Sequence, residues 1–439
     1  MKKIIALLMV MMLAFSLVAC NNQPANNEGG NAGGNNAGEN NAGGTDTAKE
    51  AAITLWTYPV GQWQDSAVVD GLIAEFNKVY PNIKVSVEYL DYANGDDQVN
   101  SAIEGNKAPD LILEGPERLV ANWGAKGLMV DLADLWTDAD KSDIYESVQK
   151  ACFNPEGACY EFPLCMTAHT MAINYDLFKE AGALQYLDEE TRTWTTDGYE
   201  KAIQAVYDHV QENVTAVFCN GQGGDQGTRA LINNLYSGTF ANAEHTQYTA
   251  NTPENIKALE LLKGMKGVNF DASLNGGDEI NLFCNGTLAV ANCWNVGAEK
   301  ANADKLGFDA FPMAFPSDDG KPELCGGIWG FGIFNNGDQA KIDAAKTFIK
   351  YICTEAPAAN VKASTFWSVR KSLENIYEGD ALMTEYGKFM PYMGDYYQVT
   401  KGWAEARTAW WNMLQKIGTG TPVSDAVAEF DATANGAAQ

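Results

Sequence analysis

An alternation of strand-like and helix-like segments most constrains how this 439-residue chain can fold. Half-buried strands alternate apolar and polar residues, whereas amphipathic helices place apolar residues three and four positions apart. By these patterns the expected order is strand 53–57, helix 66–80, strand 83–89, helix 97–105 and strand 110–113. Pro81 ends the first helix. A strand–helix–strand–helix–strand order predicts a parallel α/β layer with right-handed crossovers.

Similar patterns continue to the end of the chain. We expect further strands at 171–173, 216–219 and 327–334, and helices at 176–182, 197–212, 228–235, 253–265 and 339–354. The last third is expected to be helical, with Pro422 in the first turn of a short final helix.

Length and charge narrow the class of protein. The about 390 residues after the amino-terminal region are too many for one comfortable core, so two lobes are expected. Lys and Arg total 30 against 57 Asp and Glu, giving a formal net charge of -27. This acidity argues against nucleic acid or an anionic membrane surface as a partner.

The first twenty residues have the pattern of an export signal. A charged start, Met1-Lys2-Lys3, precedes an apolar stretch that is too short for an ordinary membrane span. The closing Leu17-Val18-Ala19-Cys20 resembles the lipobox of bacterial lipoproteins, which implies that Cys20 is lipidated and becomes the mature N-terminus. The alternative is an ordinary signal peptide that ends near a cysteine.

A segment without large apolar residues follows, from Asn21 to about Lys49. It cannot bury enough surface to offset its backbone entropy, so we expect it to be a disordered tether. A Gly-rich coil of about 28 residues spans roughly 30 Å. Signal, cysteine and tether together predict a lipid-anchored protein on the extracellular face of the bacterial cytoplasmic membrane.

Cysteine and histidine usage gives no sign of a metal or other cofactor. Eight cysteines follow Cys20, without metal-binding spacing, and most lie in apolar runs where we expect free, buried thiols. Cys152–Cys159 is the best disulfide candidate, and whether it forms is left open. The three histidines form no cluster, so we expect neither a catalytic metal nor a cofactor.

Nine short segments carry a family resemblance through their order and spacing. They are 53–56, 76–85, 108–111, 127–132, 160–163, 173–178, 193–195, 283–294 and 403–409. Together they resemble family 1 extracellular solute-binding proteins, the maltose-binding-protein-like receptors of ABC importers. Residues 287–290 depart modestly from the family pattern.

The resemblance implies an α/β, two-lobed, periplasmic-binding-protein-like fold (type II) with ligand in the inter-lobe cleft. The implied parts are a signal peptide 1–19, a lipidated cysteine and tether 20–50, an N-lobe from 51–160 and 327–358, and a C-lobe from 161–326 and 359–439. Chain crossings are expected near 162–163, 322–327 and 354–359, where hinge motion would close the lobes.

Sugar chemistry selects the candidate site residues. Aromatic rings cover the apolar C–H faces of a sugar, and carboxylates and amides bind its hydroxyls. The resemblance places Trp294 and Trp403 where the family stacks its sugar, and Glu117 and Arg118 where an acidic–basic pair contacts hydroxyls. The other candidates are Trp56, Tyr58, Trp63, Glu114, His169, Gln226, Trp329 and Arg407. For each aromatic residue, the alternative is a place in the core.

These features predict a monomeric, non-catalytic receptor that delivers a neutral sugar to the membrane subunits of an ABC importer. An oligosaccharide is expected, with a malto-oligosaccharide as the first guess. One alternative is a lipid-anchored glycan-cleaving enzyme. Another is the same receptor fold with a glycerophosphodiester or peptide ligand, for which Arg118, Arg229, Arg370 and Arg407 would have to converge on an anion.

Overall fold

The first predicted strands and helices build the parallel part of a larger sheet. The computed structural model describes residues 50–91, 94–221 and 224–439. In it, β1 (Ala51–Thr57) pairs in parallel with β2 (Ile83–Tyr89) and β3 (Leu111–Glu114). Helices α1 (Ser66–Val79) and α2 (Gly95–Glu104) connect these strands. The predicted parallel α/β layer is confirmed.

Three antiparallel strands from later in the chain complete this sheet, whose order is β11-β4-β10-β3-β1-β2. They are β4 (Phe162–Ala168), β10 (Gly326–Ile333) and β11 (Trp367–Ser368). A Cβ atom on Gly326 would lie 1.9 Å from the Thr167 carbonyl oxygen, so only glycine allows β10 to approach β4 this closely.

A second group of strands forms the other lobe. β5 is the centre of a three-stranded antiparallel sheet with β8 and β9, and β6 pairs in parallel with β7. Their bounds are β5 (Thr170–Asn174), β6 (Thr215–Phe218), β7 (Val268–Asp271), β8 (Val290–Trp294) and β9 (Ala310–Met313).

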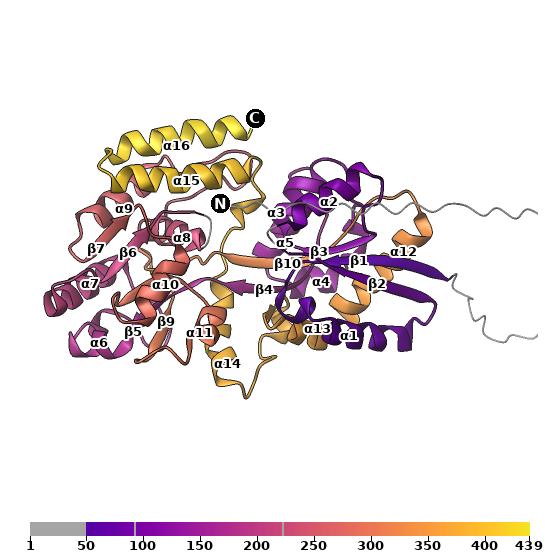
Figure 1. Cartoon of the computed structure of the whole chain (residues 1–439), viewed down its shortest axis with the longest axis horizontal. Helices are drawn as coiled ribbons and strands as arrows, with labels where there is room; N and C mark the ends of the chain where they lie inside the picture. Colours follow the sequence, from indigo (N-terminus) through magenta and orange to yellow (C-terminus); the bar gives the residue numbers. More distant parts are fainter. Residues whose placement is uncertain (1–49, 92–93, 222–223) are drawn as a thin grey trace, which may run out of the picture. The chain divides into compact units, whose positions relative to one another are not determined.

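Helices cover both groups of strands (Figure 1). The remaining α-helices are α3 (Pro116–Arg118), α4 (Asp138–Asp143), α5 (Glu146–Cys152), α6 (Tyr175–Glu180), α7 (Thr196–Val210), α8 (Asp225–Leu235), α9 (Pro253–Gly264), α10 (Gly276–Cys284), α11 (Val296–Asn302), α12 (Gln339–Lys350), α13 (Pro357–Ser364), α14 (Ala381–Gly387), α15 (Trp403–Gly418) and α16 (Val423–Ala437). The predicted helices are confirmed, but α16 has 15 residues and is not short. It packs along α15 at the carboxyl end.

Two transfers of the chain between the lobes follow directly from the strand pairings. β4 belongs to the six-stranded sheet and β5 to the three-stranded sheet, so the chain transfers at His169, beyond the predicted 162–163. The return lies between β9 and β10, a stretch that includes the predicted 322–327.

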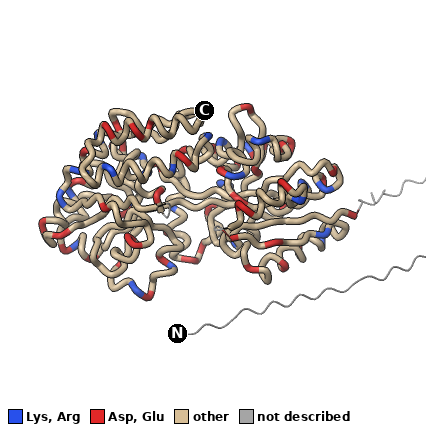
Figure 2. Tube along the Cα trace, turned by 45° about the horizontal axis from the view of Figure 1, so that its top comes forward, with Lys and Arg blue, Asp and Glu red and all other residues tan. Residues whose placement is uncertain are grey.

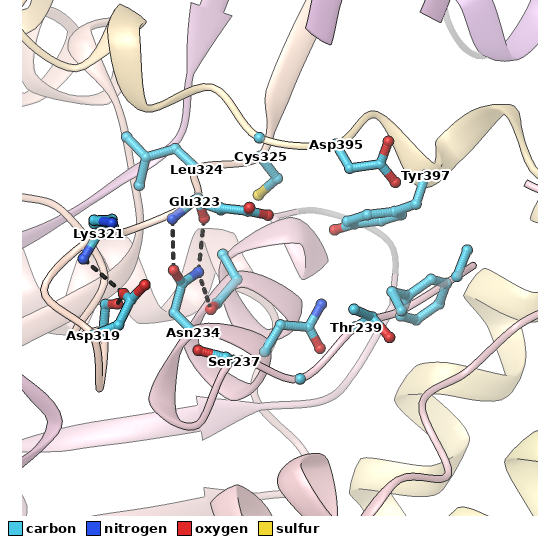
Figure 3. Close-up of a pocket in the computed structure, with 17 residues that line it drawn as sticks. Asn234, Ser237, Thr239, Asp319, Lys321, Glu323, Leu324, Cys325, Asp395 and Tyr397 are labelled. Atoms are coloured by element: carbon cyan, nitrogen blue, oxygen red, sulfur yellow. Dashed lines mark hydrogen bonds between the residues drawn. The ribbon is translucent and has the colours of Figure 1, made fainter. Parts of the chain in front are cut away.

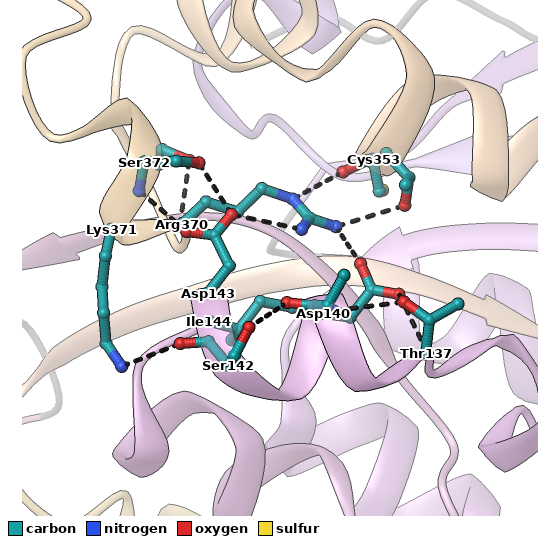
Figure 4. Close-up of polar contacts among 12 residues, drawn as sticks. Thr137, Asp140, Ser142, Asp143, Ile144, Cys353, Arg370, Lys371 and Ser372 are labelled. Atoms are coloured by element: carbon teal, nitrogen blue, oxygen red, sulfur yellow. Dashed lines mark hydrogen bonds and ion pairs between the residues drawn. The ribbon is translucent and has the colours of Figure 1, made fainter.

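The third transfer lies beyond the predicted 354–359, because β11 still pairs with β4. An ion-pair network then holds the chain to α4 (Figure 4). The Arg370 guanidinium contacts Asp140 at 2.7 Å and donates from Nε to the Cys353 carbonyl oxygen at 3.0 Å. The Ser372 backbone N–H and hydroxyl donate to Asp143. The exact lobe boundaries therefore stay a prediction, while residues up to Ser372 are bonded to the first lobe.

Cysteine pairing follows the main expectation. Within the described residues the eight cysteines are free and buried, and Cys152 and Cys159 are not linked. No helix in this part of the chain combines the length and apolarity that crossing a bilayer requires. The predicted signal peptide, the lipidated Cys20 and the tether up to Lys49 lie outside the described residues.

The Arg370–Asp140 pair is expected to be a large contributor to stability. Both side chains are more than nine-tenths buried, so Arg370→Met leaves the Asp140 carboxylate buried without its cation. We expect the free energy of unfolding to fall by about 3–5 kcal/mol in urea denaturation. Lys346→Met, which removes the exposed pair with Asp134, is the control and should lose no more than about 1 kcal/mol. Equal losses in the two variants would contradict the role given to the buried pair.

Candidate ligand-binding site

The first half of the candidate site lies where β3 ends, at an edge where open α/β sheets bind ligands. Glu114 is the last residue of β3, and α3 carries Arg118 one turn later. Arg118 contacts Glu114 through Nη1 and Asp96 through Nε, both at 2.7 Å. Asp96 also accepts a hydrogen bond from the Tyr58 hydroxyl. The predicted residues Tyr58, Glu114 and Arg118 therefore form one cluster with Asp96, which was not predicted.

Burial and ion pairing set the charges of this cluster. Burial raises the pKa of Glu114 to about 8, although Arg118 opposes the shift. Burial alone would lower the pKa of Arg118, but Glu114 and Asp96 raise it above its ordinary value. The Arg118 guanidinium therefore stays charged, and the Asp96 carboxylate, whose pKa it lowers, is its ionised partner.

A third carboxyl group, Glu161, is near enough to this cluster to feel its charges and was not among the predicted site residues. Its side chain is fully buried, and neither oxygen has a hydrogen-bond partner among the described residues. Burial, together with the charges of Glu117 and Glu114, raises its pKa well above the ordinary value. Glu161 precedes β4 directly, so only the strand pairing could have revealed its position.

The second half of the site is built on α8 and α15. The Arg407 guanidinium makes two contacts to the Asp225 carboxylate, both at 2.8 Å, and Arg229 contacts the same carboxylate at 2.7 Å. Burial would raise the pKa of Asp225, but the two arginines outweigh it and lower the pKa. Gln226, the next residue of α8, is half-buried.

Trp403 and His169 border this second cluster. The Trp403 ring lies 4.9 Å from the Arg229 guanidinium and 5.9 Å from the Tyr397 ring, and it is half-buried. Burial lowers the pKa of His169 to about 4, so its imidazole is neutral at neutral pH. Its Nδ1 atom is enclosed without a hydrogen-bond partner within the described part of the chain.

Three consecutive residues, Tyr396–Gln398, connect the two clusters, and we call them the linking segment. The Tyr396 hydroxyl donates to Glu117 at 2.8 Å, and the Tyr397 hydroxyl accepts from Arg229 Nε at 3.1 Å. Gln398 accepts from Gln226 at 3.2 Å and donates to the Gly326 carbonyl oxygen at 3.2 Å. Each lobe therefore contributes polar groups to the same region.

The remaining half-buried aromatic candidates lie on the six-stranded sheet. Trp329 on β10 stacks on Phe366, with ring centroids 4.7 Å apart and planes inclined by 12°. Trp56 on β1 packs against a small apolar cluster that contains Tyr58 and Trp123. Both tryptophans keep part of their surface exposed.

Three other aromatic candidates are buried, which agrees with the alternative given for them, a place in the core. Tyr58, Trp63 and Trp294 have no exposed surface in this structure. The Trp63 indole N–H donates to the Asn360 carbonyl oxygen at 3.3 Å, and that of Trp294 donates to the Tyr386 hydroxyl at 2.7 Å. In this conformation their rings are packing residues and offer no face to a ligand.

A small cavity adjoins the linking segment. It has a volume of about 170 Å³ and lies between the end of α8, residues 317–325 and residues 394–397 (Figure 3). Its wall is held by Asn234, whose side chain exchanges two 2.7 Å hydrogen bonds with the backbone of Glu323.

Outside this region, acidic and basic residues are interspersed over both lobes (Figure 2).

Solved structures share this architecture. A cyclic α-maltosyl-1,6-maltose binding protein from Arthrobacter globiformis has 20% identity and a TM-score of 0.67, with 88% of this chain and 98% of that chain covered. The GacH receptor of Streptomyces glaucescens has 16% identity and a TM-score of 0.65, covering 87% and 97%. An ABC substrate-binding protein from Listeria monocytogenes has 18% identity and a TM-score of 0.64, covering 88% and 99%.

The fold is therefore that of the two-lobed periplasmic binding proteins of type II. No curated protein sequence matches the chain. The model of the family described as bacterial extracellular solute-binding protein matches residues 60–359, and the chain belongs to this family.

The buried Glu161 carboxyl predicts a specific dependence of stability on pH. Its raised pKa means that the folded protein holds a proton which the unfolded chain releases above about pH 4.3, so unfolding becomes easier as pH rises. Between pH 5 and pH 8 this effect lowers the free energy of unfolding of the parent protein. The change over that range should be at least about 1 kcal/mol smaller in Glu161→Gln, which cannot release this proton. Urea denaturation at both pH values measures this.

Glu254→Gln is the control, because Glu254 is exposed. It should show the same pH dependence as the parent protein. If Glu161→Gln also matched the parent at both pH values, the inferred protonation of Glu161 would be wrong.

Proposed function

We propose that this protein is an extracellular receptor that captures a neutral carbohydrate between its lobes and delivers it to an ABC importer. The favoured ligand is an oligosaccharide, with a malto-oligosaccharide as the first to test. The receptor acts without catalysis, as a monomer, and is anchored to the membrane through lipid on Cys20.

The observation that carries this proposal is the meeting of polar groups from both lobes at the linking segment. The Glu117 carboxylate and the Gln226 amide suit the donor and acceptor pattern of sugar hydroxyls. The half-buried rings of Trp329 and Trp403 are available for the C–H faces of a sugar.

Pairing of the arginines favours a neutral ligand. Arg118 pairs with the Asp96 carboxylate at 2.7 Å, and Arg370 with that of Asp140 at 2.7 Å. Arg229 and Arg407 share the Asp225 carboxylate, at 2.7 and 2.8 Å. An anionic glycerophosphodiester or peptide terminus would have to displace these carboxylates. A neutral ligand requires no such rearrangement.

The ligands named for related structures support an oligosaccharide. The Arthrobacter protein is a cyclic α-maltosyl-1,6-maltose binding protein, the Streptomyces receptor was solved with acarbose, and the Listeria protein with cycloalternan. Other related structures were solved with α-D-tagatose and ribitol, so the comparison supports a carbohydrate-like ligand and leaves its size and identity to experiment.

Ligand transfer in this proposal is conformational. A sugar that contacts both lobes gains interactions in the closed state that it lacks in the open state, so binding shifts the population towards closure. Moving the equilibrium from mostly open to mostly closed needs about 5 kcal/mol of differential affinity. Stacked rings and several hydrogen bonds in a partly dry site can supply it.

Titration calorimetry with malto-oligosaccharides and other neutral oligosaccharides tests the proposal. Trp403→Ala should weaken binding at least tenfold, about 1.4 kcal/mol, because it removes one ring of the site. Tyr186→Ala, a half-buried tyrosine beside Asp197 and Met265, is the control and should bind as the parent protein does. Binding of no sugar by the parent protein, or release of cleaved glycan products, would contradict the proposed receptor.

Membrane anchoring is tested separately in a bacterial host that processes lipoproteins. The full-length protein should be recovered with membranes and incorporate a fatty-acid label, since a lipidated cysteine holds it there. Cys20→Ser should abolish the label and reduce the membrane-bound fraction. Label incorporation into the serine variant would contradict lipidation at Cys20.

A further inference from the structure

A second groove lies apart from the linking segment, beside the edge strand β11. Its volume is about 540 Å³, within the range of small-molecule sites. Tyr145 and Tyr377 contribute half-buried aromatic rings, and the buried side chains of Trp367, Met383 and Met390 lie beneath them.

Two of the aromatic rings, those of Trp367 and Tyr377, are fixed in place. The Trp367 indole N–H donates to the Met383 carbonyl oxygen at 3.1 Å, and the Tyr377 hydroxyl donates to the Phe366 carbonyl oxygen at 2.7 Å. The Trp367 and Tyr377 rings lie 6.1 Å apart at 70°. A ligand would therefore pay little for ordering these side chains.

Exposed polar side chains surround the apolar floor. Glu374, Asn375, Thr384 and Lys388 line the groove and are solvent-exposed, while Tyr145 is half-buried. Carboxylate, amide, hydroxyl and ammonium groups together offer both donors and acceptors. Two half-buried tyrosine rings with a mixed polar rim match the two chemical faces of a sugar.

The walls of the groove come from both lobes. Tyr145 and β11 belong to the lobe of the six-stranded sheet, because the Tyr145 backbone N–H donates to the Val369 carbonyl oxygen at 3.1 Å. The opposite wall, α14, is bonded to the other lobe. Glu385 contacts Arg192 at 2.7 Å, and Tyr386 accepts from Trp294 on β8.

We propose that this groove is a second carbohydrate site, which binds a short oligosaccharide outside the inter-lobe site. The inference rests on the proposed function for the sugar class. Its occupant contacts α14 on one side and Tyr145 on the other, so it bridges the two lobes. The Tyr386–Trp294 hydrogen bond connects α14 to the strand that ends at Trp294.

Titration calorimetry of the full chain with maltose to maltohexaose tests this site. The parent protein should bind two equivalents, one tightly and one weakly. Tyr145→Ala should weaken the second binding event at least tenfold and leave the first within twofold. Tyr145→Phe keeps the ring and should restore the second event, whereas Tyr236→Ala, a half-buried tyrosine beside Lys257 outside the groove, should change neither.

The outcomes separate the two proposals. If the parent protein binds one equivalent of sugar, and Tyr145→Ala does not change its affinity, the second site is overturned and the receptor function stands. Two equivalents that are equally insensitive to Tyr145→Ala also overturn it, because the weaker site would then lie elsewhere. Binding of no sugar at all overturns both proposals.

Discussion

The hydrogen bond between Tyr396 and Glu117, with the neighbouring bonds of Tyr397 and Gln398, is the interaction on which the site depends. The N-lobe cluster is fixed by β3 and α3, and the C-lobe cluster by α8 and α15. Each lobe carries only one of the two clusters of polar groups. The three consecutive residues of the linking segment bond to Glu117, Arg229 and Gln226, so one short segment of chain connects the two clusters.

Ion pairing within each cluster explains how its ionised groups can be buried. Asp225 is shared by one arginine from its own helix and one from α15, and Arg118 is paired with Asp96. A buried charge is tolerated when it is paired and hydrogen-bonded. Glu161 has no such partner among the described residues, so it is expected to remain protonated and to tie the stability of this region to pH.

Local patterns in the sequence predicted the elements well but their partners less well. The apolar alternation of 83–89 specifies β2, because one face of a half-buried strand must be apolar. No local pattern places β10 between β3 and β4, or brings Glu161 close enough to Glu117 for the charge of Glu117 to raise its pKa, since these residues are far apart in the chain. For Trp63 and Trp294 the sequence left a place in the core as the alternative and could not decide, because their indole partners, Asn360 and Tyr386, come from distant helices.

The central claim, that the linking segment and a bound sugar hold the two lobes together, is tested most directly by an inter-lobe distance. Spin labels at Lys84→Cys on β2 and Lys201→Cys on α7 lie at exposed positions, while the described native cysteines are buried. Electron–electron double resonance should give one narrow distance with saturating oligosaccharide. Without sugar, Tyr396→Phe should broaden the distribution and lengthen its mean. A distribution unchanged by both the sugar and the substitution would contradict the account.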